Sequence, residues 1–314
     1  MAAVARDVCG QLIADLPLAS VKYAFAYGSG AIPQKGENPA EKMVDLVLCT
    51  NDSLAFHTEN LQRNRSHYSA IKWAGPRTNC AARVTYNTHI RTIGGRLIKY
   101  GVIEEGALKR DLLDWKWLYI AGRLHKPVID VIDPSPAMAE CVTQNRLSAM
   151  QAALLLLPDQ FTFPEFFERL VALSYMGDFR MIIGEDKEKV AKIAKGNAEG
   201  LRAIYEPLLQ ADLRVEVQEK GIIQVLNRLL KRYNKGKRQL HDVEEDTMAS
   251  IVRDSSITQT MKNAATAGVY RSIVYSAAKL VKWKKSLKTE EKSINKDDKS
   301  KEESNKEEDK KDQR

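Results

Sequence analysis

The chain has 314 residues, a formal net charge of +8 and a sequence pI near 9.1, so it can bury a sizeable core and has the length of two domains. Its positive charge favours an anionic partner, which could be a nucleotide, a nucleic acid or an acidic lipid surface. The four cysteines are scattered without metal-ligand spacing, and the longest apolar run, residues 152–157, is far shorter than the roughly 20 residues of a membrane-spanning helix.

The first informative feature is a glycine-rich turn between two predicted strands. Residues 21–27 are rich in β-branched and aromatic side chains and lead into Gly28-Ser29-Gly30, where backbone N–H groups can approach phosphate oxygens closely. A polar loop follows, and residues 43–49 then form a second apolar strand that carries Asp45. A carboxylate in such a strand is expected to be paired or to bind a metal ion. This order is typical of a nucleotidyltransferase, although an ordinary turn and a strand-end acid would look the same.

The rest of the first 133 residues alternates between strands and helices. Three further strands are predicted at residues 82–90, 96–103 and 126–132, and helices at 54–61 and 108–124. The prolines of Asp133-Pro134-Ser135-Pro136 predict a break between domains. We therefore expect an α/β domain over residues 1–133.

From residue 137 the apolar residues recur at three and four positions, which is the period of a helix. Helices are predicted at residues 147–157, 163–175 and 187–209. Thr162 is the expected N-cap of the second of these, with Pro164 in its first turn and Glu165 completing a capping box. We expect a mainly helical domain over residues 134–240.

The C-terminal region contains a basic amphipathic pattern at about residues 256–285, within an expected third region of residues 241–285. Tyr275 and Trp283 would suit a membrane interface, but a helix packed on the protein's own core with a solvated lysine face fits the spacing equally well. Residues 286–314 are almost entirely charged or polar and are expected to be disordered.

Several longer strings of the chain resemble the mitochondrial phosphatidate cytidylyltransferase family, also known as translocator assembly and maintenance proteins. The resemblance covers about residues 23–283. The strings are AFAYGSG (24–30), NRSHYS (64–69), RLIKYGV (96–102), LYIAGRLHKP (118–127), LSYMGDFR (173–180), and SSI (255–257) through TAG (266–268).

The resemblance implies an α/β nucleotidyltransferase-fold domain followed by a mainly helical winged-helix-like domain and a C-terminal amphipathic helix that contacts an anionic membrane surface. It implies that CTP and phosphatidic acid are converted with Mg²⁺ to CDP-diacylglycerol and pyrophosphate, which feeds cardiolipin synthesis, and no nucleic acid is expected as a partner. It also implies a peripheral location on the matrix side of the mitochondrial inner membrane, although the first 15 residues do not follow the pattern of a transit peptide.

The same resemblance suggests roles for individual residues. Gly28, Ser29 and Gly30 would bind the triphosphate, Asp45 would hold Mg²⁺, and Lys99 would face a phosphate as a point charge, unless it is a solvent-facing strand lysine. A second set of residues is predicted to contact substrate without a defined role, and Asp178 is also a candidate metal ligand, although it and Arg180 could equally form a salt bridge between domains. This set comprises His67, Tyr68, Asn87, Asp178 and Arg180. His125 is interpreted as a structural histidine.

The chain departs from the family pattern in three places. Nucleotidyltransferases commonly carry a second acid two residues after the first, but this chain has Val47, so a remote acid such as Asp178, Asp130 or Asp52 would complete the metal shell, or Mg²⁺ would rely on triphosphate and water. The segment before Tyr86 is short, and Phe56-His57 replaces Trp-His.

Two alternatives stay open: a nucleotidyltransferase acting on RNA or protein, and a catalytically degenerate membrane-peripheral adaptor.

Overall fold

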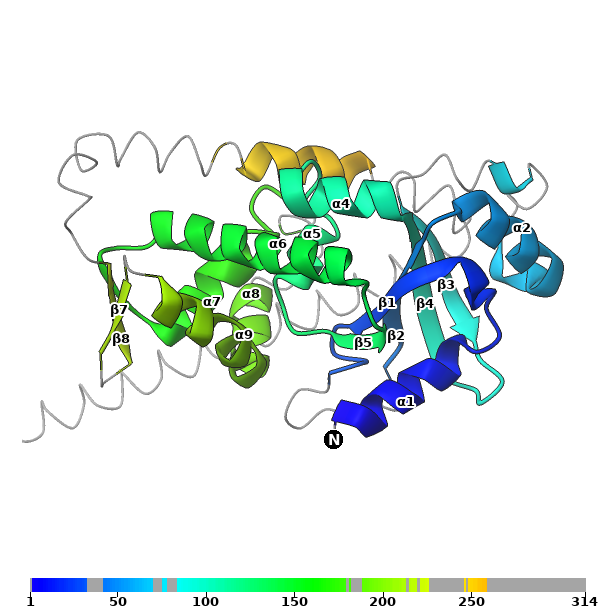
Figure 1. Cartoon of the computed structure of the whole chain (residues 1–314), viewed down its shortest axis with the longest axis horizontal. Coiled ribbons are helices and arrows are strands. Elements are labelled where there is room, and N and C mark those ends of the chain that lie inside the picture. Colours follow the sequence, from blue (N-terminus) through cyan, green and yellow to red (C-terminus); the bar gives the residue numbers. More distant parts are fainter. Residues whose placement is uncertain are drawn as a thin grey trace, which may run out of the picture.

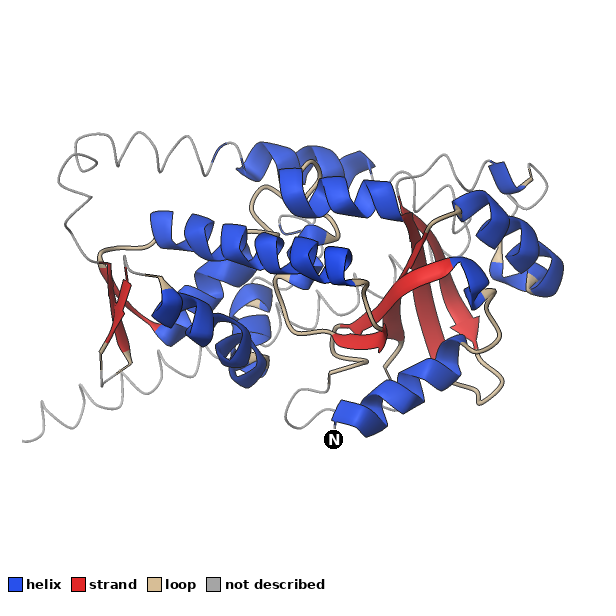
Figure 2. Ribbon diagram, viewed as in Figure 1, coloured by secondary structure: helices blue, strands red, loops and turns tan. Residues whose placement is uncertain are grey.

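The structure, a computed structural model, forms two packed units (Figure 1). One unit is a five-stranded sheet with helices on both faces, and the other combines helices with a small three-stranded sheet (Figure 2). Within the described residues, no helix combines the length and the apolar character needed to cross a bilayer. The described residues are 2–32, 42–69, 75–77, 84–178, 181, 188–212, 215–218, 221–225, 246 and 248–258.

The sheet of the first unit has the strand order β3-β4-β2-β1-β5, in which β2 and β4 are parallel and the other neighbours antiparallel. Long runs of β-branched and aromatic residues form its central strands, which are buried on both faces. The strands are β1 (Val21–Tyr27), β2 (Val44–Thr50), β3 (Val84–Arg91), β4 (Leu97–Glu104) and β5 (Ile129–Ile132).

Different helices cover the two faces of this sheet. On one face, here called the α1 face, α1 and α2 pack on alternate strand residues such as Leu46 and Tyr100. The opposite face, here called the α4 face, packs Val47 and Ile103 against α4, α5, α6 and the helical residues 248–258. These helices are α1 (Ala2–Ile13), α2 (Ser53–Arg63), α4 (Glu105–Asp114), α5 (Ala121–Leu124) and α6 (Pro136–Leu155), and single 3-10 turns are η1 (Leu18–Ser20) and η3 (Arg65–His67).

The second unit packs its helices around a core of aromatic side chains that includes Phe166 and Tyr205. Helix α6 belongs to both units, because Met138 and Val142 lie in the core of the α4 face whereas Met150 and Ala153 lie in the second core. The remaining elements are α7 (Phe163–Ala172), α8 (Lys189–Gly196), α9 (Ala198–Ala211), β6 (Gln160–Thr162), β7 (Val215–Val217) and β8 (Ile222–Val225), with the antiparallel strand order β6-β8-β7.

Most of the predicted elements are present. The predicted strands match β1 to β5 within a few residues, and the predicted α/β class of the first unit is confirmed. The capping box is also confirmed: Thr162 accepts from the backbone N–H of Glu165, whose carboxylate accepts from the Thr162 N–H at 2.7 Å. Only the first residues of the helix predicted over 256–285 are described, and residues 286–314 lie outside the described residues.

The prediction of one helix over residues 108–124 is wrong. Helix α4 ends at Asp114, Trp115 and Leu118 have positive φ angles, and α5 begins at Ala121. The cause is the buried carboxylate of Asp111, which accepts backbone N–H groups at 3.1, 2.7 and 2.9 Å and pulls the chain back toward α4. Its donors are the N–H groups of Trp117, Ile120 and Ala121.

The prediction of one helix over residues 187–209 is also wrong. The chain breaks at Asn197, whose side-chain amide donates to the Ile193 carbonyl at 2.8 Å, so α8 and α9 are separate helices. The second unit is mainly helical and also contains the strands β6, β7 and β8, none of which was predicted individually. Each has three or four residues, which is too short for an alternation pattern to appear in the sequence.

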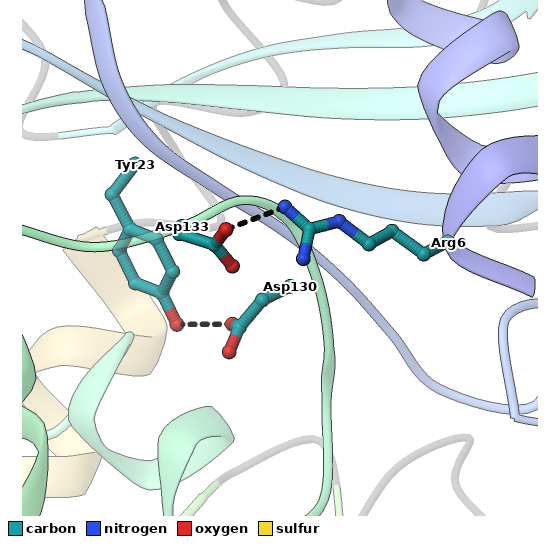
Figure 3. A network of polar contacts seen from close by, with 4 residues as sticks. All are labelled: Arg6, Tyr23, Asp130 and Asp133. Atoms are coloured by element: carbon teal, nitrogen blue, oxygen red, sulfur yellow. Dashed lines mark hydrogen bonds and ion pairs between the residues drawn. The ribbon is translucent and has the colours of Figure 1, made fainter. Parts of the chain in front are cut away.

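Polar contacts fasten α1 and β5 to the sheet edge (Figure 3). The Tyr23 hydroxyl on β1 donates to Asp130 on β5 at 2.8 Å, and Arg6 on α1 pairs with Asp133 just beyond β5 at 2.6 Å. The Arg6–Asp133 pair is largely exposed and contributes little stability. Burial raises the pKa of Asp130, and its hydrogen bond to Tyr23 opposes that shift.

We expect the Asp111→Asn variant to lose about 2 to 4 kcal/mol of unfolding free energy, because an amide offers one oxygen and an N–H₂ group to three inward-pointing N–H donors. Equilibrium urea unfolding would measure the loss. The matched control is Asp114→Asn on the exposed end of the same helix, which should unfold like the wild type. Equal stabilities for the two variants would contradict the role given to Asp111.

Candidate functional site

The turn after β1 requires glycine at two positions. Gly28 has φ +76°, a left-handed conformation that other residues adopt at a cost, and a Cβ on Gly30 would overlap the Met43 carbonyl oxygen. The Gly28 carbonyl accepts from the N–H groups of Ala31 at 3.1 Å and Ile32 at 2.9 Å. Among the described residues, the N–H groups of Ser29 and Gly30 have no backbone acceptor, so the turn offers donors to an anion.

Asp45 and Lys99 lie beside this turn on the α4 face. The parallel register of β2 and β4 sets them next to each other, and Lys99 Nζ is 3.5 Å from Asp45 Oδ1. A Cβ added to Gly28 would lie 3.6 Å from Asp45 Oδ2, so the carboxylate faces the turn. The structure therefore brings together the five residues predicted to bind the nucleotide and metal: Gly28, Ser29, Gly30, Asp45 and Lys99.

The donor set around Asp45 fits a magnesium ion that keeps most of its ligands from water or substrate. The Asp45 side chain is 29% exposed, whereas Val47 at the usual second-acid position is fully buried in the core. In the part of the chain that the structure describes, no three His, Cys, Asp or Glu side chains form a metal-binding group. Mg²⁺ is commonly held by one or two carboxylates together with phosphate oxygens and water.

The other acids considered as partners of Asp45 have different engagements. Asp52 caps α2 by accepting from the Ala55 N–H at 2.8 Å, at the opposite end of β2 from Asp45. Asp130 accepts from Tyr23. Asp178 is buried in the turn that follows α7, where its N–H donates to the Tyr175 carbonyl.

Two tyrosines and a glycine support Lys99. A Cβ on Gly101 would lie 2.6 Å from the Tyr86 ring, so the glycine lets this ring lie directly on β4. Lys99 Nζ lies 4.6 Å from the centroid of the Tyr86 ring, and the Tyr119 ring meets Tyr86 edge-on at 6.3 Å. The Tyr86 hydroxyl is buried and has no hydrogen-bond partner among the described residues.

Arg123 lies between the rings of Tyr27 and Tyr119. Its guanidinium carbon is 5.2 Å from the Tyr27 centroid and 4.1 Å from the Tyr119 centroid, and its Nη1 donates to the Tyr119 carbonyl. Tyr27 is the last residue of β1 and pairs with Asp45 across the strands. Arg123 thus carries a positive charge to the edge of the Asp45–Lys99 site.

The structure places His67, Tyr68 and Asn87 on the α1 face, across the sheet from Asp45 and Lys99. The hydroxyl of Tyr100 is their hub: Asn87 and Asn60 each donate to it at 2.8 Å, and His67 Nδ1 lies 2.9 Å away. Because both amides are donors, the hydroxyl proton is directed to His67 Nδ1, which sets the neutral tautomer with Nε2 protonated.

Tyr68 joins this network through α2. Its hydroxyl accepts from Asn60 at 2.8 Å and lies 2.9 Å from His57 Nδ1. Burial lowers the pKa of His57 to about 4, so this imidazole is neutral at physiological pH. The contacts of the network are internal and stabilise the packing of α2 on the sheet.

Asp178 lies in a turn after α7 in which its N–H donates to the Tyr175 carbonyl. A Cβ on the preceding Gly177, which has φ +71°, would overlap the Ala249 carbonyl, so this turn packs against the helix of residues 248–258. Arg180 lies outside the described residues.

His125 has the structural role expected of it. It is fully buried, its Nε2 lies 3.1 Å from Asn145 Oδ1, and its carbonyl accepts from the Tyr205 hydroxyl at 2.8 Å. Burial lowers its pKa to about 3.

Sequence reasoning assigned no role to Tyr27, Tyr86, Tyr119 or Arg123. The signal that could have found Tyr27 and Tyr86 is the alternation of side chains along each strand. Every second residue points to the same face of the sheet, and Tyr27 and Tyr86 point to the face of Asp45 and Lys99. Arg123 had no such signal, since its position depends on the break between α4 and α5.

Comparison with known proteins identifies close relatives over most of the chain. The family model described as "Phosphatidate cytidylyltransferase, mitochondrial" matches residues 9–227 and 216–282. A protein of that name from Caenorhabditis briggsae is 46% identical over 320 residues, covering 89% of this chain and 99% of the relative. Proteins of the same name from Xenopus laevis and Mus musculus are each 38% identical, covering 85% and 87% of this chain and 92% and 94% of their own lengths.

Two tyrosine-to-phenylalanine variants should differ sharply in stability. Tyr100→Phe leaves two buried amide donors and His67 Nδ1 without their partner, so we expect a loss of about 2 to 4 kcal/mol. Tyr86→Phe removes a buried hydroxyl that has no described partner, so its unfolding free energy should stay within about 0.5 kcal/mol of the wild type or rise. Urea unfolding of both variants under identical conditions checks the pair, and a larger loss for Tyr86→Phe would contradict the assignment.

Proposed function

The chain belongs to the family of mitochondrial phosphatidate cytidylyltransferases, and we propose that it transfers the cytidylyl group of CTP to phosphatidate, giving CDP-diacylglycerol and pyrophosphate. The observation that carries the proposal is the Asp45–Lys99 pair beside the Gly28-Ser29-Gly30 turn, in a chain that matches the family model from residue 9 to residue 282. A carboxylate, a cation and free backbone donors are the groups that a nucleoside triphosphate needs.

The triphosphate of CTP would lie over the turn. The N–H groups of Ser29 and Gly30 and the Ser29 hydroxyl would donate to its oxygens, and Lys99 would bring a point charge from β4. Lys99 Nζ lies at the Tyr86 ring and 3.5 Å from Asp45 Oδ1, from where it could turn to a phosphate. This supports a role for Lys99 in substrate charge neutralisation.

Asp45 is the residue that would hold Mg²⁺. Its partial exposure and the absence of a second acid at Val47 fit a metal ion that takes its remaining ligands from CTP and water. When bound, Mg²⁺ would neutralise negative charge on the phosphate oxygens of CTP.

For this reaction the protein has to position the two substrates and stabilise the charge on their phosphates. A phosphate oxygen of phosphatidate forms a bond to the α-phosphorus of CTP while the bond from that phosphorus to the bridging oxygen breaks and pyrophosphate leaves. A phosphate monoester is largely ionised at neutral pH, so its oxygen needs no protein base. Lys99 would contribute by stabilising charge on the reacting phosphates.

We further propose the cellular setting that the family resemblance implies. The enzyme would act at the matrix side of the inner mitochondrial membrane, supplying cardiolipin synthesis, and its basic segment of residues 256–285 would contact anionic lipid. The second unit would have a winged-helix-like arrangement, which its three-stranded sheet and helices α7 and α9 support. The mitochondrial names of the relatives support the compartment.

The full-length protein should form a lipid-soluble cytidylate from labelled CTP, Mg²⁺ and phosphatidic acid in mixed micelles. We expect Asp45→Asn and Lys99→Met each to lower kcat by about 10²-fold or more, because each removes charge stabilisation at the reacting phosphates. Thin-layer separation of the labelled lipid measures the rate.

Matched controls are Asp114→Asn and Lys22→Met, which remove the same charges at exposed positions away from the site and should keep wild-type rates. Absence of lipid product with intact vesicle binding would favour the adaptor instead. Transfer of cytidylate to RNA or protein without any need for phosphatidic acid would favour the other nucleotidyltransferase alternative.

A further inference from the structure

A row of cations leads from the Asp45–Lys99 site toward the second unit. Arg123, at the end of α5, touches Tyr27 and Tyr119 at the site. Lys126 follows three residues later, and because the backbone is helical through His125, the two side chains lie on the same side of the turn. Both fold back on the chain: Arg123 donates to the Tyr119 carbonyl and Lys126 to the Gly122 carbonyl.

Lys126 lies where the two units meet. Its Nζ is 3.0 Å from the Ser174 hydroxyl oxygen and 5.7 Å from the centroid of the Tyr175 ring. Lys189, at the start of α8, approaches the same ring to 5.1 Å. Cations from the turn after α5 and from α8 therefore meet at the Tyr175 ring.

Neither Arg123 nor Lys126 forms an ion pair with a carboxylate in the described part of the chain, and Arg123 Nε is buried without a hydrogen-bond partner there. The Asp111 carboxylate feels the Arg123 charge, but its oxygens are engaged by three backbone N–H groups. Burial, together with the charges of Arg123 and Lys189, lowers the pKa of Lys126 to about 7. Both residues are partly exposed, and neighbouring like charges without a counter-ion repel each other unless an anion joins them.

The position of these cations suits the second substrate better than CTP. The turn after β1 and Lys99 already provide for the triphosphate, and in-line displacement requires the attacking oxygen to approach the α-phosphorus from the side opposite the leaving pyrophosphate. Arg123 lies at the Tyr27 ring, just before the turn, and Lys126 continues from it to Ser174 and Tyr175 in the second unit. A phosphate monoester carries between one and two negative charges at neutral pH, and such an anion beside Lys126 would favour its protonated form, so the phosphate would meet two cations.

We propose that Arg123 and Lys126 form an acceptor subsite that binds the phosphate monoester of phosphatidate and holds it for attack on CTP. This inference rests on the proposed function. In this subsite Arg123 contacts the phosphate nearest the reacting centre and Lys126 holds it from the side of the second unit. Lys189 adds positive charge behind the Tyr175 ring.

The subsite is built rigidly. A Cβ on Gly122 would overlap Ser174, and a Cβ on Gly200 would lie 2.6 Å from Pro127 Cγ, so both glycines allow the units to approach closely on either side of Lys126. The hydrogen bond from the Tyr205 hydroxyl to the His125 carbonyl fixes the backbone between Arg123 and Lys126. Such support positions a cation with little loss of freedom on binding.

Calorimetric titration of the full-length protein with dihexanoyl phosphatidate, a soluble short-chain lipid, tests the subsite without turnover. We expect Arg123→Gln and Lys126→Met to weaken this binding by about 10- to 100-fold while the Kd for CTP with Mg²⁺ changes less than about twofold. Lys126→Arg keeps the charge and should retain most of the affinity. The matched controls are Arg110→Gln and Lys116→Met, both exposed, which should bind like the wild type.

Two further ligands define what is recognised. Inorganic phosphate should bind more weakly than dihexanoyl phosphatidate and show the same sensitivity to both variants, whereas dihexanoyl phosphatidylcholine, which has no phosphate monoester, should not bind. Equal affinity for the phosphatidylcholine would overturn the subsite. A loss of CTP affinity in Lys126→Met, with dihexanoyl phosphatidate binding unchanged, would overturn it in favour of a triphosphate contact.

Steady-state kinetics separates failure of this subsite from failure of the proposed function. In a wild-type protein that forms CDP-diacylglycerol, Lys126→Met should raise the KM for phosphatidate by about 10-fold or more and leave the KM for CTP unchanged. An unchanged KM for phosphatidate would overturn the subsite and leave the cytidylyltransferase function standing. Dihexanoyl phosphatidate binding that depends on Lys126, in a wild-type protein that makes no CDP-diacylglycerol, would overturn the function and uphold the subsite.

Discussion

The buried carboxylate of Asp111 determines where Tyr119 and Arg123 lie beside the candidate site. By accepting three backbone N–H groups it ends α4, turns the chain through two residues with positive φ and starts α5 at Ala121. Had α4 continued, Tyr119 and Arg123 would have moved along its axis, away from β1. One buried acid thus ends the helix in a sharp connection that brings Arg123 to the end of β1. Three N–H donors offset the loss of hydration that its burial entails.

The two faces of the sheet carry different groups: the candidate site lies on one face and a supporting hydrogen-bond network on the other. On the α4 face, the parallel register of β2 and β4 sets Asp45 beside Lys99, and the aromatic rings of Tyr27 and Tyr86 flank them. On the α1 face, the next residue of β4 is Tyr100, whose hydroxyl gathers the amides that hold α2 in place. Because side chains alternate along β4, Lys99 faces the candidate site and Tyr100 faces the supporting hydrogen-bond network. A change of register by one residue would exchange the two faces, so the buried network protects the geometry of the site.

The local patterns of the sequence predicted the strands and the Gly28–Asp45 neighbourhood, because aromatic and β-branched runs and a glycine turn are short-range signals. The contact between Asp45 and Lys99 could not be derived in this way, since β2 and β4 are far apart in the chain and their pairing is a property of the whole sheet. The break after α4 was missed because Asp111 looks like an ordinary residue of the polar face of a helix. Strand parity alone would have separated Asn87 from Tyr86, since adjacent strand residues point to opposite faces.

The distribution of charge explains why the two units must pack so closely. Both substrates are anions, and bringing the phosphate of one to the α-phosphorus of the other is opposed by repulsion unless cations lie on both sides of the reacting centre. Lys99 comes from the sheet, whereas Lys126 is held in place by Ser174 of the second unit. In the proposed acceptor subsite, a small displacement of that unit would shift one cation relative to the other and misalign the attack. Glycine at positions 122 and 200 allows this close packing, because a Cβ would collide with Ser174 at the first position and with Pro127 at the second.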